Sequence, residues 1–281
     1  MVKIYTETTC DLSLEHLSSL GVEPLPMRLT LDGVEYVDRY GLSPAEFFSI
    51  LKNAKGVPTT SQITPAAYIE VMEQVKAEGG EALFVVFSSE LSGTFQSAVL
   101  AEKEVNYPGI RIIDSKAASA GLGLMVDTLA RMAKDGASME ELYRKAEWLR
   151  DHMEHLVVVE NLEMLKRGGR ITPVAAFMGG VMNIKPILEM RNGKLIPFEK
   201  AKGRKKAMRR IVDLMGERCP EISRQRFFIA HGDDPQGAAE LDDMVFETYG
   251  IRAALITELG PVVGSHTGPG VLTLFFLNAY E

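Results

Sequence analysis

Two short stretches of the sequence are rich in hydroxyl side chains that could hold an anion. The first stretch precedes a predicted helix, and the second follows the apolar run 83–87 and opens onto another predicted helix. At a helix N-terminus the unpaired N–H groups and the helix dipole favour negative charge, and Ser and Thr add further donors. The same residue types are also common helix N-caps, so both interpretations stand. The hydroxyl residues concerned are Thr59, Thr60, Ser61, Ser88, Ser89, Ser92 and Thr94.

One histidine, His266, lies in the Gly-rich segment 264–270. We expect a turn there, open enough to bring the backbone close to a ligand. The imidazole could donate to a carboxylate or carry a proton, because its usual pKa lies near neutrality. With Ser92 and Asp114 it could also form a triad-like set for an acyl or phosphoryl hydrolase. However, the loop around Ser92 lacks the Gly-x-Ser-x-Gly pattern of a nucleophile elbow, and the favoured role of Asp114 is to cap the long helix that follows it.

Basic residues concentrate in two places. Arg170 follows the tight turn Gly168-Gly169, and the stretch 200–210 holds seven Lys and Arg residues, among them Lys202 and Arg204. This stretch is either a docking surface for an acidic or phosphate-bearing partner or a solvated helix face. A DNA-binding regulator is a third possibility, but the net charge of -7 argues against nucleic acid as a partner.

The sequence does not support several other classes of site or protein. The two histidines His152 and His155 have no Cys or carboxylate set at metal-binding spacing, and no phosphate-binding glycine motif is present, so we expect neither a metal nor a cofactor. The cysteines Cys10 and Cys219 form no disulfide framework. The N-terminus lacks the apolar core of a signal peptide, and no apolar run reaches the roughly 20 residues of a membrane span. We therefore expect a soluble cytoplasmic protein without stable membrane insertion.

The first half of the chain alternates apolar strands with helices. Strands are predicted over 3–6, 83–87 and 110–113, and helices over 94–106 and 117–134, which indicates a parallel sheet covered on both faces. Asp11 is expected to cap a helix that ends at Leu20. Asp32-Gly33 predicts a hairpin between 25–31 and 34–37, and Ser43-Pro44 and Thr64-Pro65 each begin a helix.

The second half is patterned differently, which suggests a boundary near residue 150. Asn192-Gly193 predicts a hairpin between 184–190 and 195–200, and a basic helix follows from 204 to 218. Strands are expected over 155–160, 226–231 and 252–258, while 271–279 is either a strand or a helix. The expected fold is α/β with two domains. Residues 1–150 form an α/β/α layered domain with a mainly parallel sheet, and residues 151–281 form an α+β domain with a mixed or antiparallel sheet.

Seven short motifs in this order resemble the DegV family, the bacterial fatty-acid-binding proteins. Each motif alone has little specificity, but together they run nearly end to end. They are TTCDL at 8–12, PTTSQ at 58–62, SSxLSGTFQSA at 88–98, DS at 114–115, GGRI at 168–171, KKA at 205–207 and HxGPG at 266–270.

The resemblance implies the EDD fold and a non-catalytic role in phospholipid metabolism. A long-chain fatty acid would lie at the domain interface, its carboxylate held by Thr60, Ser61 and Ser92 with His266 nearby. Lys202 or Arg204 would lie near the head group. Arg170 would help to engage a separate fatty acid kinase, which phosphorylates the carboxylate. Apolar segments at 175–182, 184–188 and 271–276 are candidates for the tunnel wall or for ordinary core.

Overall fold

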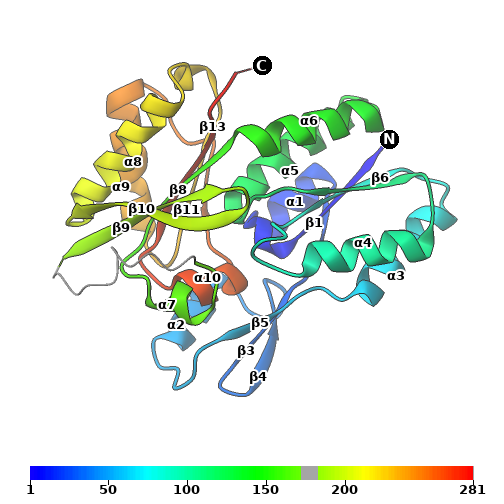
Figure 1. Ribbon diagram of the computed structural model, residues 1–281, viewed down its shortest axis with the longest axis horizontal. Helices are drawn as coiled ribbons and strands as arrows, with labels where there is room; N and C mark the ends of the chain where they lie inside the picture. Colours follow the sequence, from blue (N-terminus) through cyan, green and yellow to red (C-terminus); the bar gives the residue numbers. More distant parts are fainter. Residues whose placement is uncertain (172–182, 281) are drawn as a thin grey trace.

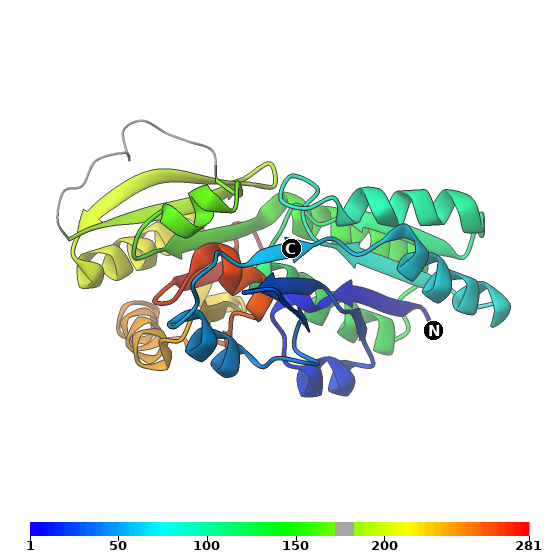
Figure 2. The same cartoon turned by 90° about the horizontal axis from the view of Figure 1, so that it is seen from below.

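The computed structural model describes residues 1–171 and 183–280, whose strands form three sheets (Figure 1, Figure 2). The first sheet is parallel throughout, in the order β2-β1-β6-β7. β6 is buried along its length. Leu83 and Val85 face an apolar layer built with α1, α5 and α6, while Phe84 and Val86 face a layer built with α3 and α4. Burial on both faces is why this strand is a continuous apolar run.

The elements of this part of the molecule have the following bounds: β1 (Lys3–Glu7), η1 (Thr8–Cys10), α1 (Leu14–Leu20), β2 (Glu23–Leu25), α3 (Pro65–Ala77), β6 (Ala82–Val86), α4 (Thr94–Val105), β7 (Ile110–Asp114), α5 (Ser119–Lys134) and α6 (Met139–His152).

The second sheet has six strands in the order β10-β9-β8-β13-β11-β12, and all its pairs are antiparallel except β11–β12. Helices α8 and α9 cover one face with a separate apolar core (Figure 1). Helix α5 contacts strands of both this sheet and the parallel sheet, so it lies between them. The elements are β8 (Met153–Val158), α7 (Glu163–Arg167), β9 (Ile184–Arg191), β10 (Lys194–Lys202), α8 (Arg204–Arg218), η3 (Ile222–Arg224), β11 (Phe228–His231), α9 (Pro235–Tyr249), β12 (Leu255–Glu258) and β13 (Leu272–Leu277).

A small third sheet joins distant parts of the chain. It consists of β4 (Val34–Val37), β3 (Arg28–Leu31) and β5 (Thr59–Ser61) in the order β4-β3-β5. The late helix α10 (Pro261–Thr267) contacts β3, β5, α2 (Pro44–Leu51) and α7. In Figure 1 these elements gather below the two larger sheets. The start and the end of the chain thus build one region together.

The two predicted hairpin turns and the helix starts predicted at Ser43 and Thr64 are confirmed. Asp32 and Gly33 have φ of 49° and 80°, and Asn192 and Gly193 have φ of 49° and 81°, as a two-residue hairpin turn requires. Ser43 forms both hydrogen bonds of a capping box at the start of α2.

Two predicted caps are wrong. Helix α1 is capped by Ser13, which accepts from the His16 N–H, while Asp11 is fully buried in a left-handed conformation with φ of 53°. Asp114 does not cap α5, because the chain continues to Ala118 before that helix begins. Instead Asp114 accepts from the backbone N–H groups of Ser89 and Lys116.

The predicted fold class is confirmed: an α/β protein with a parallel sheet and a second, mixed sheet. Most of the undecided segment 271–279 is a strand, β13 (Leu272–Leu277), which pairs with β8 and β11. The domain boundary near residue 150 stays a prediction. None of the helices within 1–171 and 183–280 has the length and apolar character needed to cross a membrane.

Candidate functional site

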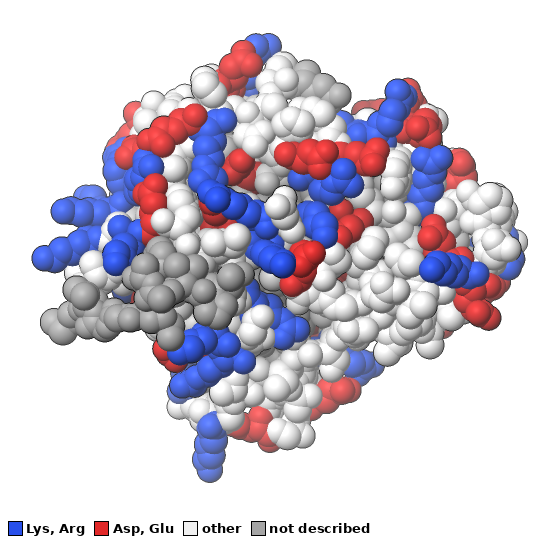
Figure 3. Space-filling model, viewed as in Figure 1, with Lys and Arg blue, Asp and Glu red and all other residues white. Residues whose placement is uncertain are grey.

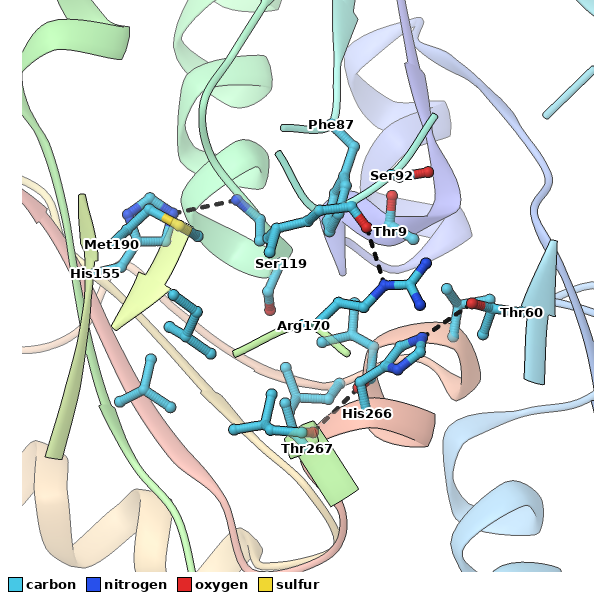
Figure 4. Close-up of a pocket in the computed structure, with 18 of the residues that line it drawn as sticks. Thr9, Thr60, Phe87, Ser92, Ser119, His155, Arg170, Met190, His266 and Thr267 are labelled. Carbon is cyan, nitrogen blue, oxygen red and sulfur yellow. Dashed lines mark hydrogen bonds between the residues drawn. The ribbon is translucent and has the colours of Figure 1, made fainter. Parts of the chain in front are cut away.

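A cavity of about 170 Å³ lies where the three sheets meet. One end is polar, and the close-up in Figure 4 shows Thr9, Thr60, Ser92, Arg170 and His266 gathered there. The rest of the wall is mostly apolar. Its apolar side chains include Met27, Phe87, Leu91, Val157, Leu165, Met190, Leu195, Leu259, Val262, Val263 and Phe275. The cavity is therefore shaped for a ligand with one polar end and an apolar body.

Thr60 and His266 lie 206 positions apart in the sequence and are brought together by the fold. Thr60 is the middle residue of β5, and its Oγ1 shares a hydrogen bond of 2.9 Å with His266 Nε2. The expectation that His266 lies in an open turn is wrong, because residues 261–267 form helix α10, which begins with Pro261 after Gly260. Helix α10 packs on β5, and this contact is what aims the imidazole at the hydroxyl.

His266 is half-buried, and its buried Nδ1 has no hydrogen-bond partner among the described residues. Burial, and then the positive charge of Arg170, lower the pKa of His266 to about 4. The ring is consequently neutral at pH 7 and carries a single N–H. It can orient the Thr60 hydroxyl, but it is a poor reservoir for a proton.

Ser92 stands in the loop that leads from β6 into α4. Its Oγ lies 2.9 Å from Thr94 Oγ1 and accepts from the Thr94 N–H at 3.3 Å, so the hydroxyl lies at the helix N-terminus. The other two serines of this loop are occupied elsewhere. Ser88 donates to the Gly193 carbonyl at 2.8 Å, and Ser89 accepts from Lys116 Nζ at 2.8 Å. Of the three, Ser92 is the one that lines the cavity.

Arg170 supplies positive charge inside the cavity (Figure 4). Its Nε donates to the Leu91 carbonyl at 3.0 Å, and its Nη1 donates to the Gly168 carbonyl at 2.6 Å. Gly169, with φ of 69°, turns the chain back so that the guanidinium reaches the loop of Ser92. The turn thus directs Arg170 inward, toward the cavity.

The structure does not bring every predicted site residue to the cavity. Ser61 is exposed on β5, and neither it nor Lys202 nor Arg204 lines the cavity. Arg204 donates to Glu160 Oε1 at 2.8 Å and to the Gly270 carbonyl at 2.7 Å, and it also pairs with Asp234.

The proposed wall segments contribute unequally. Thr273 and Phe275 of the 271–276 segment line the cavity, and β9 contributes Met190, which lies beyond the 184–188 segment. Segment 175–182 lies outside the described residues.

The basic stretch 200–210 is partly neutralised. Arg210 pairs with Glu199 at 2.7 Å and with Glu217 at 2.6 Å. Lys and Arg side chains are interspersed with Asp and Glu over the face drawn in Figure 3. These ion pairs are typical of a solvated helix face.

The triad-like set is not assembled. His266 bonds to Thr60, Ser92 bonds to Thr94, and Asp114 bonds to the backbone of Ser89. Within the described part of the chain, no group of three or more His, Cys, Asp or Glu side chains is placed to hold a metal ion.

Sequence reasoning missed Glu7 and Thr9 as parts of this region. Thr9 lines the cavity, and its hydroxyl donates to Glu7 Oε2 at 3.2 Å. Glu7 is fully buried, and burial raises the pKa of its carboxyl to about 7. The available signal was a carboxylate at the carboxyl end of strand β1, whose last four residues are buried.

His155 was also missed, and it lies at the other end of the cavity beside Met190 (Figure 4). Its Nε2 accepts from the Ala118 N–H at 3.2 Å, and its ring packs edge-on against Phe275 with centroids 5.2 Å apart. Burial lowers the pKa of His155 to about 4, so this ring is neutral and behaves as part of the apolar wall.

Comparisons with known proteins all identify the same family. A family model described as an uncharacterised protein of the DegV family matches residues 1–279. The chain is 37% identical over 282 residues to a DegV domain-containing protein of Clostridium perfringens, and the match covers 98% of this chain and 97% of the other. The resemblance predicted from the seven motifs is confirmed.

Solved structures agree with this match. A DegV family protein from Thermus thermophilus, described as binding fatty acid, superposes with a TM-score of 0.89 at 33% identity, covering 98% of this chain and 99% of that chain. A stearic acid-binding protein from Eubacterium ventriosum gives a TM-score of 0.91 at 26% identity, with 99% of each chain covered. A Thermotoga maritima protein described as revealing a fatty acid binding function gives 0.85 at 29% identity, with 98% of each covered.

Proposed function

The chain belongs to the DegV family, and on that basis we propose that it binds a long-chain fatty acid in the cavity, with the carboxylate at the polar end. The observation that carries the proposal is the division of the cavity into a charged, hydroxyl-bearing end and an apolar body. The fatty acids named for the Thermus and Eubacterium proteins support the choice of ligand.

The polar end offers what a buried carboxylate needs. Burying this group is costly unless several donors meet it, and bonds from charged donors are the strongest of these. In the proposed complex Arg170 supplies the charge, Thr60 and Ser92 supply hydroxyl donors, and His266 fixes the direction of the Thr60 hydroxyl.

The apolar body would supply most of the affinity. Each buried methylene contributes about 0.8 kcal/mol, so a chain of ten or more carbons outweighs the cost of ordering it. The lining residues come from both halves of the chain, which supports a binding site between the two predicted domains, 1–150 and 151–281.

We further propose that the protein does not modify the lipid but presents it to a separate kinase, which transfers a phosphoryl group from ATP to a carboxylate oxygen. The bonds of Ser92 and His266 to other partners support a non-catalytic role, because neither is paired with the other. In this proposal Arg170 serves the bound carboxylate and lies near the point where the kinase engages.

The first test is native mass spectrometry of the purified protein, followed by lipid extraction. We expect one fatty acid per chain. A protein that carries no lipid and takes up none when it is offered would overturn the proposal. Modification of Ser92 by a serine-reactive probe, lost in Ser92→Ala, would then favour the hydrolase.

Matched variants of β5 test the site itself. Thr60→Val removes a hydroxyl that faces the cavity, whereas Ser61→Ala removes the neighbouring hydroxyl that does not line it. We expect Thr60→Val to weaken fatty acid binding by about 10-fold and Ser61→Ala to leave it unchanged. Arg170→Met should weaken binding by about 10- to 100-fold, because a charged partner is lost. Equal effects of the two β5 variants would contradict the proposed carboxylate position.

A further inference from the structure

A buried carboxylate lies directly behind the polar end of the cavity. Glu7 ends β1 and is fully buried. Its Oε1 accepts from Tyr68 Oη at 3.2 Å and from the Phe87 N–H at 3.1 Å, while its Oε2 accepts from Thr9 Oγ1 at 3.2 Å. All three donors are uncharged, which is unusual for a buried acid.

Thr9 connects this carboxylate to the cavity. Its side chain lies beside Ser92 and Arg170 in Figure 4, at the end where the proposed carboxylate would bind. A threonine hydroxyl has one proton, and here that proton is donated to Glu7. Toward the cavity Thr9 Oγ1 therefore presents lone pairs only, which would repel the oxygens of a bound carboxylate.

We propose that Glu7 is a positioning residue for the ligand, and that the fatty acid carboxylate binds together with one proton taken from solvent. The proton goes to Glu7 Oε2, which then donates to Thr9 Oγ1. The Thr9 hydroxyl turns into the cavity and donates to the carboxylate. No covalent bond of the ligand changes, and the ligand and one proton enter together. This inference rests on the proposed function.

The titratable groups around Glu7 leave it as the natural acceptor of that proton. Burial raises the pKa of Glu7 to about 7, and the nearby charge of Asp114 raises it further. Burial also raises the pKa of the Cys10 thiol to about 12 and holds the pKa of Tyr68 well above its usual value, so neither exchanges a proton near neutral pH. Among the described residues that line the polar end, the competing acceptor is His266, whose pKa is lowered to about 4 by burial and by the charge of Arg170.

The consequence is a characteristic dependence of affinity on pH. Above about pH 7 the wild-type protein must take up a proton to bind, so its affinity should fall by about 10-fold for each further pH unit. In Glu7→Gln the amide oxygen can keep the bonds from Tyr68 and Phe87, and the amide nitrogen can donate to Thr9. The variant therefore imitates the protonated acid, and its affinity should stay flat.

The experiment is titration calorimetry with monomeric dodecanoate, in two buffers of different ionisation enthalpy, at about pH 6 and about pH 8.5. We expect the wild-type protein to take up close to one proton at the higher pH and much less at the lower. Glu7→Gln should take up none. His266→Gln should bind more weakly, because Thr60 loses its partner, but its proton uptake per bound ligand should equal that of the wild-type protein.

Each other outcome overturns the inference. Three results would overturn it: proton uptake by Glu7→Gln equal to that of the wild-type protein, proton uptake lost only in His266→Gln, or no proton uptake by the wild-type protein. If Glu7→Gln fails to fold, Thr9→Val provides the same test, because it removes the hydroxyl through which the two sites communicate. A wild-type protein that does not bind dodecanoate or longer chains at either pH would instead refute the proposed function.

Discussion

The contact between Gly168 and His266 gives a sharp test of how the polar end is built. A Cβ added to Gly168 would lie 2.2 Å from His266 Nδ1 and 3.1 Å from its Cε1. Gly168 has φ of -71°, so its backbone accepts alanine without strain. Nonbonded atoms of this kind prefer a separation of about 3.5 Å, and Gly168→Ala must therefore push the ring away by roughly 1 Å.

This displacement sets the expected loss of stability and of fatty acid affinity in Gly168→Ala. Overpacking of this size destabilises a protein by about 1–3 kcal/mol. The moved ring also loses its 2.9 Å bond to Thr60, so fatty acid binding should weaken by about 2- to 10-fold. In a His266→Ala background the obstacle is gone, and alanine at position 168 should then stabilise the fold by about 0.4–1 kcal/mol.

Urea unfolding of the wild-type protein, the two single variants and the double variant measures this change of sign. Gly80→Ala is the matched control, because a Cβ there would meet the Val75 carbonyl oxygen at an ordinary 3.7 Å. If Gly168→Ala costs the same free energy with and without the histidine ring, then the ring is not the obstacle and the reasoning is refuted.

Three further predictions concern buried charges. Arg39→Met should lower the free energy of unfolding by about 3–5 kcal/mol, because Asp11 and Asp38 would lose their buried cation. Urea titration measures this loss, and a value below about 1 kcal/mol would contradict the prediction. Burial raises the pKa of Asp127, but hydrogen bonds from Arg131, Arg226 and His16 outweigh burial and hold this pKa below its usual range. The ionised carboxylate therefore stabilises the fold above about pH 4, and this stabilisation decreases as the pH falls. Asp127→Asn should therefore be destabilised at pH 7, with the difference shrinking in acid; a constant difference would argue against the ion pairs. The pKa of Glu7 is raised from 4.5 to about 7, so the free energy of unfolding of the wild-type protein should fall by about 3 kcal/mol as the pH rises between those values. Thermal unfolding of Glu7→Gln should show no such fall.

Locally encoded features could be predicted from the sequence. The hairpins at Asp32-Gly33 and Asn192-Gly193, the capping box at Ser43 and the buried strand β6 each depend on residues a few positions apart. Turn geometry and strand burial leave direct signatures in residue type, which is why these predictions agree with the structure.

Features set by distant parts of the chain could not be predicted in the same way. Asp11 has the sequence context of a helix cap, yet its carboxylate accepts from Ser119 Oγ at 2.6 Å and from the Gly260 N–H at 2.8 Å, in a cluster that no local pattern encodes. His266 lies among glycines that suggest a turn, but the packing of α10 on β5 makes the segment helical.

For the candidate site, motif resemblance identified Thr60, Ser92 and His266, which the structure brings to one cavity. The inward turn of Arg170 and the packing of Thr9 and Glu7 against the cavity depend on tertiary contacts, which no local sequence pattern encodes.

The joining of distant segments at the polar end also bears on the order of events during folding. Thr60 and His266 are separated by 206 positions, and Asp11 and Gly260 by 249. Closing a loop of that length costs about 5 kcal/mol of chain entropy, so such contacts form late unless others have already drawn the ends together.

The single tryptophan, Trp148, lies in α6, which packs near the parallel sheet and away from this junction. We therefore expect Trp148 fluorescence to recover before fatty acid binding does when the unfolded protein is diluted into buffer; simultaneous recovery would contradict this order. On this account a bound lipid would mark chains in which helix α10 has already packed on β5.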